Sequence, residues 1–173
     1  MGADWKFALL GGLAEPTAPR VLTAADFHRL VQKFRPGASA STARVAAGLM
    51  VSAKALERVS SGLFLNKRLM PPASLMESAL HIRSGAVISL HSVLGECGFL
   101  NNPPALVTAV LPTSTSKRPR LGDVTTSAGK AFRFFGLAER FFPGSDAERR
   151  ELLQPGRHCE MFRPEAALVH WIH

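Results

Sequence analysis

Two cationic side chains, Lys54 and Arg58, stand four residues apart in the stretch 53–59. In a helix this spacing would place both on one face, with Leu56 and Val59 turned inward. Long cationic side chains on a free helix face suit the phosphates and the guanine edges of duplex DNA. The spacing therefore predicts that 53–59 is a helix, capped by Ser52, that lies in the major groove. One residue opposes this role, because Glu57 would repel phosphates unless it contacts a cytosine amino group.

Other polar residues of the first 70 positions extend this predicted DNA-binding surface. A second short helix is predicted at 39–48, capped by Ser41 or Thr42, and its N-terminus would hold a phosphate. A strand predicted at 63–66 ends beside two further cations that would touch the flanking backbone. The residues predicted to bind DNA are Ser41, Thr42, Arg44, Ser52, Lys54, Arg58, Lys67 and Arg68.

The elements that would position these side chains have the order of a winged helix-turn-helix. A first helix is predicted at 24–34, with Thr23 as its N-cap, Asp26 in its first turn and Pro36-Gly37 after its end. Three short helices followed by a strand would then clamp the third helix against the first two and leave its cationic face free for the major groove. We therefore predict a winged helix over residues 23–70.

The rest of the chain reads as a small mixed α/β unit, so the predicted fold class is α+β. Pro71-Pro72 marks the boundary, which gives an N-terminal segment at 1–22, the winged helix at 23–70 and the α/β domain at 71–173. Apolar periodicity predicts helices and short strands in this last part. The predicted helices are 74–83, 90–98 and 164–173, and the predicted strands are 85–89, 106–111 and 131–135.

The composition agrees with a DNA partner and with a cytoplasmic location. The chain carries 21 basic and 13 acidic side chains, and residues 1–70 hold ten basic against four acidic ones. A positive field of this kind attracts a polyanion. Two cysteines form no disulfide framework, which is typical of a reducing cytosol. No apolar stretch approaches the roughly 20 residues that a membrane-spanning helix needs, so no membrane partner is expected.

A second basic cluster and several reactive side chains invite other interpretations. Lys117, Arg118 and Arg120 would form either a second phosphate-binding loop or an ordinary solvated loop. Ser89 and His91 suggest a nucleophile and a base, but no acid stands where it would orient the histidine. We therefore expect no catalytic residues and no enzyme.

The sequence offers no motif for a metal or a nucleotide cofactor. Cys97, His158 and Cys159 lack the paired short spacings of a structural zinc site. The glycine-rich motifs that bind nucleotide phosphates do not occur. We expect no cofactor and no metal.

Four segments resemble the AbiEi-type antitoxins. The stretch 82–94, IRSGAVISLHSVL, is similar to that family's LRxGAxISLxSAL block, and 59–66 resembles the join between its winged helix and the next segment. The stretch 106–112 resembles the strand after that block, and 163–168 resembles the PExALxD segment near the C-terminal helices.

This resemblance implies a two-part antitoxin of a type IV toxin–antitoxin system. Its winged helix would bind inverted repeats in its own promoter and repress the operon, and its α/β domain would counter a nucleotidyltransferase-like toxin without a tight complex. The sequence departs from the family in two places. The family normally continues beyond the segment 163–168, whereas this sequence ends at His173, and the expected aspartate is replaced by His170 or Trp171.

Two other functions stay open. The helices could instead dock a protein partner, in which case the positive charge is incidental. A nuclease-like enzyme is the second alternative, although the carboxylates that would hold its metal, Asp123, Glu139 and Asp146, are scattered.

Overall fold

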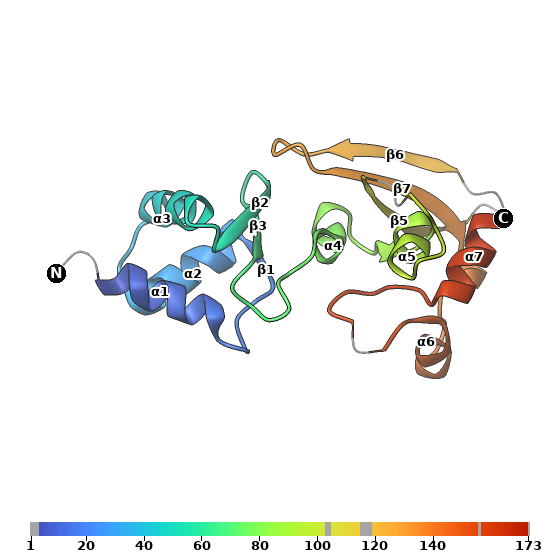
Figure 1. Ribbon diagram of the computed structural model, residues 1–173, viewed down its shortest axis with the longest axis horizontal. Helices are drawn as coiled ribbons and strands as arrows, with labels where there is room; N and C mark the ends of the chain where they lie inside the picture. Colours follow the sequence, from blue (N-terminus) through green and yellow to red (C-terminus); the bar gives the residue numbers. More distant parts are fainter. Residues whose placement is uncertain (1–3, 103–104, 115–118, 156, 173) are drawn as a thin grey trace. The chain divides into compact units, whose positions relative to one another are not determined.

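The computed structural model describes residues 4–102, 105–114, 119–155 and 157–172. The chain forms two compact units, Met1–Leu75 and Met76–His173 (Figure 1). The first contains helices and a small three-stranded sheet, and the second contains a mixed four-stranded sheet with short helices. The predicted α+β class is therefore confirmed.

The first unit alternates helices with short strands. Its strands form an antiparallel sheet in the order β1-β3-β2, and a tight turn at 61–62 joins β2 to β3. Gly62 takes a φ of 78° in this turn, a conformation that side chains with a Cβ rarely adopt. The elements are α1 (Asp4–Ala14), β1 (Val21–Thr23), α2 (Ala24–Phe34), α3 (Ala40–Ser52), β2 (Leu56–Ser60) and β3 (Leu63–Asn66).

Helix α2 begins as predicted, after the N-cap Thr23, which forms a capping box with Asp26. The Thr23 hydroxyl accepts a hydrogen bond from the Asp26 backbone N–H, and the Asp26 carboxylate accepts one from the Thr23 N–H. The hydrogen bond from the Thr23 side chain is the main cause that lowers the pKa of Asp26. The helix buries Phe27, Leu30 and Val31, so the prediction at 24–34 is confirmed.

The predicted helix at 53–59 is wrong. Helix α3 continues through Gly48 to Ser52, the chain turns at 53–55, and Leu56–Ser60 is strand β2, paired with β3. A glycine inside a helix costs about 1 kcal/mol, but α3 offsets this by burying Ala43, Ala46, Ala47 and Met50. Lys54 and Arg58 therefore do not share a helix face.

Helix α1, rather than the stretch 53–59, packs with α2 and α3 in the first unit. The apolar run within residues 1–22, Phe7–Ala14, was interpreted as the first core segment, and α1 does pack Leu9 and Leu13, both fully buried, into the same core as Phe27. Asn66 lies at the end of β3 and its amide donates to the carbonyls of Leu13 and Pro19. These bonds tie the end of α1 and the following loop to the sheet.

The turn at Lys54 gives a first testable prediction. Lys54 has a φ of 57°, in the left-handed region that disfavours side chains with a Cβ. Lys54→Gly should raise the free energy of unfolding by up to about 1 kcal/mol, since relief of strain outweighs the extra entropy of the unfolded chain. Lys54→Val should lower it. Urea denaturation of the three proteins tests this order, and a glycine variant less stable than the valine variant would contradict it.

The second unit is built on a mixed sheet in the order β4-β5-β7-β6. Strands β5 and β7 run parallel, and the other neighbours are antiparallel. Phe132 and Phe134 of β7 and Phe162 are fully buried. The elements are η1 (Leu75–Ser78), α4 (Ala79–Ile82), β4 (Val87–Ile88), α5 (His91–Glu96), β5 (Val107–Thr113), β6 (Arg120–Thr125), β7 (Ala131–Ala138), η2 (Glu139–Phe141), α6 (Asp146–Leu152) and α7 (Pro164–Ile172).

The sequence predictions for this unit are partly confirmed. Helices near 90–98 and 164–173 and the strands near 106–111 and 131–135 are present. The helix predicted at 74–83 is a 3-10 turn followed by a single α-helical turn. Strand β6 and helix α6 were not predicted. Helix α6 buries no side chain and so has no apolar face that would indicate it in the sequence. None of the described helices is long and apolar enough to span a bilayer.

Candidate nucleic-acid interface

Helix α3 has one buried and one free face. Its buried face consists of small residues and Met50, so the helix lies close to α2. The opposite face carries Arg44, and also two apolar residues that solvent reaches, Val45 at 66% exposure and Leu49 at 42%. A helix held by one side with the other side open is what an interface with a groove requires.

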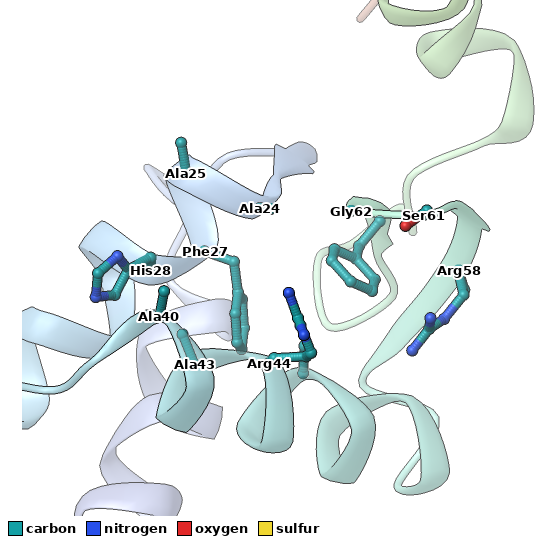
Figure 2. Close-up of a pocket in the computed structure, with 12 residues that line it drawn as sticks. Ala24, Ala25, Phe27, His28, Ala40, Ala43, Arg44, Arg58, Ser61 and Gly62 are labelled. Carbon is teal, nitrogen blue, oxygen red and sulfur yellow. The ribbon is translucent and has the colours of Figure 1, made fainter.

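A hollow of about 440 Å³ lies on one side of this free face, between α2, α3 and the β2–β3 turn. Figure 2 shows the side chains of Arg44, from α3, and Arg58, from β2, turned into it. The Arg58 guanidinium lies 5.6 Å from the centroid of the Phe64 ring, so a cation–π contact holds it in place. Phe64 in turn packs on Phe27, with ring centroids 6.1 Å apart.

Two more cations lie on the other side of α3. A second hollow, of about 310 Å³, is lined by Trp5, Lys6 and Arg35 together with α3 residues that include Val45 and Leu49. The Arg35 guanidinium lies 5.4 Å and the Lys6 amino group 5.9 Å from the Trp5 ring centroid. The free face of α3 is thus flanked by positive charge on both sides.

The charges nearest to α3 are not neutralised by acids. Within the described part of the chain, neither Arg44 nor Arg58 forms an ion pair. Two of the acids of this unit are paired elsewhere: Asp26 with Arg29, and Glu57 with Lys67 at 3.2 Å. The pairing with Lys67 also holds the Glu57 carboxylate, the one acid expected to oppose DNA binding.

Ser41 and Thr42 lie in the first turn of α3, but neither is its N-cap. Ser39 is the cap: its hydroxyl accepts from the Thr42 N–H at 3.2 Å and lies 2.8 Å from the Ser41 hydroxyl. Arg44 follows one turn later on the exposed side. The first three predicted residues therefore do lie together at one end of α3, with Ser41 and Thr42 two and three residues after its N-cap rather than at it.

The remaining predicted residues are more dispersed. Ser52 ends α3, where its hydroxyl donates to the Gly48 carbonyl, and so does not cap a third helix. Lys54 is in the turn that follows α3. The Lys67 amino group donates to the Ala73 carbonyl at 2.8 Å, besides its pairing with Glu57, and Arg68 is exposed after β3.

The second basic cluster is only partly described. Lys117 and Arg118 lie outside the described residues, and Arg120 begins β6. Arg120 and Arg133 both bind the Asp123 carboxylate, and hydrogen bonds from Arg133 first and then Arg120 lower the pKa of Asp123 to about 2. Arg120 therefore already has an anionic partner within its own sheet.

The residues that suggested a nucleophile belong to a buried hydrogen-bond network. The Ser89 hydroxyl lies 2.9 Å from Nδ1 of His170, not of His91, and these two side chains are 0% and 2% exposed. The Thr108 hydroxyl donates to the Ser89 carbonyl at 2.7 Å. His91 instead receives a hydrogen bond from the Trp171 indole at 3.1 Å. Burial places the Ser89 hydroxyl beyond the reach of a substrate, so the network joins α7 to the sheet.

The candidate metal ligands do not gather. Asp123 lies on β6, Glu139 begins η2 and Asp146 begins α6. Within the ranges that the structure describes, no three His, Cys, Asp or Glu side chains form a group that could hold a metal ion.

Comparison with known proteins gives a structural match but no family. No protein-family model and no curated protein matches the chain. Among solved structures it is similar to the Rv2827c protein from Mycobacterium tuberculosis, with a TM-score of 0.52 and 19% identity over 95% of this chain. The match covers 59% of that protein, so the chain spans less than two thirds of its length. At this identity the likeness extends to the fold alone.

Proposed function

We propose that the first unit is a winged helix that binds double-stranded DNA, with α3 as its recognition helix. The order of helices and strands and the sheet order β1-β3-β2 support this proposal. In this arrangement α1 and α2 hold α3, and β2 and β3 form a short wing beside it. The recognition helix is thus 40–52, one element earlier than the stretch that sequence spacing had suggested.

The observation that carries the proposal is the pair of cationic flanks around α3. A helix in the major groove, roughly 12 Å wide, has a phosphate backbone on each side. Arg58 on one flank and Lys6 and Arg35 on the other would meet these two backbones. Phosphate contacts of this kind fix the position of a protein on the duplex, and the side chains of the helix itself then read the bases.

We further propose that the protein is a transcriptional regulator of the AbiEi antitoxin kind, which represses its own operon. The proposal rests on the sequence resemblance of the block 82–94, which here spans β4 and most of α5. A cytoplasmic location and a functional pairing with a nucleotidyltransferase-like toxin belong to the same proposal. A neighbouring reading frame for such a toxin would support it.

A salt titration of DNA binding tests the proposed interface. If three of the cations around α3 contact phosphates, the logarithm of the binding constant should fall with the logarithm of salt concentration with a slope of about −3. Fluorescence anisotropy with a labelled duplex measures this slope. A protein-docking surface would give no binding to the duplex, and Mg²⁺-dependent cleavage of plasmid DNA would favour the nuclease alternative. Either result would contradict the proposal.

A further inference from the structure

The free face of α3 is mostly apolar, although it is exposed. Beside Arg44 it presents Val45 and, one turn on, Leu49. Gly48 lies three residues after Val45 and directly before Leu49, on the same side of the helix. A Cβ added at Gly48 would meet nothing within 4 Å, so this point of the helix surface is open. The face therefore combines one cation with two aliphatic side chains around a place where the backbone itself can be approached closely.

This combination matches a particular feature of the major groove. The C5 methyl of thymine is the one apolar group that a base pair presents there, and guanine presents two acceptors that a guanidinium can bind. A protein partner would also accept Val45 and Leu49, but the cations on both sides of α3 favour a polyanion.

We infer that α3 selects thymine-containing sites, with Val45 and Leu49 packed on thymine methyl groups beside a guanine bound by Arg44. The inference rests on the proposed DNA binding. Val45 is placed to make the main contact because it is the more exposed of the two and directly follows Arg44. Gly48 would let the base edges come near the helix axis, which short aliphatic side chains need in order to reach a methyl group.

The experiment uses the full chain and a DNA duplex that has been selected for binding to it. Repeated selection from a library of randomised duplexes should enrich sequences that contain thymine next to guanine. In the selected duplex, each thymine is then replaced by deoxyuridine, which lacks only the methyl group. Loss of a buried methyl should weaken binding about fourfold at the contacted position, since a buried CH₂ contributes about 0.8 kcal/mol.

A Val45→Ala variant completes the test. It removes two methyl groups from an exposed helix position, so the fold should persist and binding to the selected duplex should weaken about tenfold. On the deoxyuridine duplex, which already lacks the fourfold contribution of the methyl group, the same variant should weaken binding only about two- to threefold. Val169→Ala, an equally small change at an exposed valine of α7, is the matched control and should leave binding unchanged.

The outcomes separate the inference from the proposed function. If Val45→Ala weakens binding equally on the thymine and deoxyuridine duplexes, or not at all, methyl reading is wrong while salt-dependent DNA binding stands. Selection that enriches no sequence also overturns it. If no duplex binds in the salt titration, the proposed function itself fails and this inference with it.

Discussion

Replacing Arg44 by alanine should weaken binding to the selected duplex about 10- to 100-fold while the fold stays intact. Arg44 is exposed on α3 and is turned into the hollow beside the β2–β3 turn (Figure 2). It forms no ion pair with any described residue. A guanidinium that reads a guanine is worth about 1–3 kcal/mol. Fluorescence anisotropy at one fixed salt concentration gives the two binding constants, and circular dichroism verifies the fold.

Two further variants show whether the effect comes from position or from charge. Arg150→Ala removes the same charge from an exposed position of α6 and should change binding little. Arg44→Lys keeps the positive charge but lacks the planar guanidinium that binds a guanine edge. Compared with Arg44→Ala it should recover the electrostatic attraction to DNA, but its discrimination between sequences should stay weak. Equal losses for Arg44→Ala and Arg150→Ala would mean that net charge alone is responsible, and α3 would no longer be the recognition helix.

The sequence was informative where a local interaction decides the structure. Helix α2 was placed correctly because its cap and its apolar spacing lie within a few residues of each other, and Thr23 and Asp26 form the capping box directly. The strand at 63–66 was also predicted correctly, because its apolar run is short and bounded by polar residues. Such signals need no knowledge of the rest of the chain.

The helix predicted at 53–59 was misplaced because tertiary packing overrides local propensity at Gly48. Glycine usually ends a helix pattern, but here Ala46, Ala47 and Met50 pack into the core on both sides of it and carry α3 on to Ser52. The spacing of Lys54 and Arg58 then had no structural meaning, because one residue lies in a turn and the other on a strand.

Contacts between distant parts of the chain lay beyond the reach of the sequence. Lys6 and Arg35 join the candidate interface only because the start of α1 and the end of α2 both lie beside α3, and no local spacing relates them. The same holds in the second unit, where Ser89 pairs with a histidine 81 residues away. Residue types indicated the chemistry of the site, and the topology decided which of them meet.

Replacing Phe27 by alanine should destabilise the first unit by about 3–5 kcal/mol, a larger effect than a substitution on its surface would have. Phe27 is 1% exposed in the core between α2 and α3 and packs on Phe64. Its loss would leave a cavity under the ring that holds Arg58, so DNA binding should also weaken at temperatures where the unit is still folded. A domain of this size has a total stability of only about 5–15 kcal/mol, so much of it would be lost.

The chain offers a matched control and a local probe for this measurement. Phe7→Ala makes the same chemical change on α1, where the side chain is 72% exposed, and should alter the free energy of unfolding by less than about 0.5 kcal/mol. In a Trp171→Phe background, Trp5 is the one remaining tryptophan, and its fluorescence during urea denaturation reports on the first unit. If Phe27→Ala cost no more than Phe7→Ala, the core that positions α3 and strands β2 and β3 would have to be different from the one described, because a ring enclosed on all sides cannot be removed without loss of its contacts.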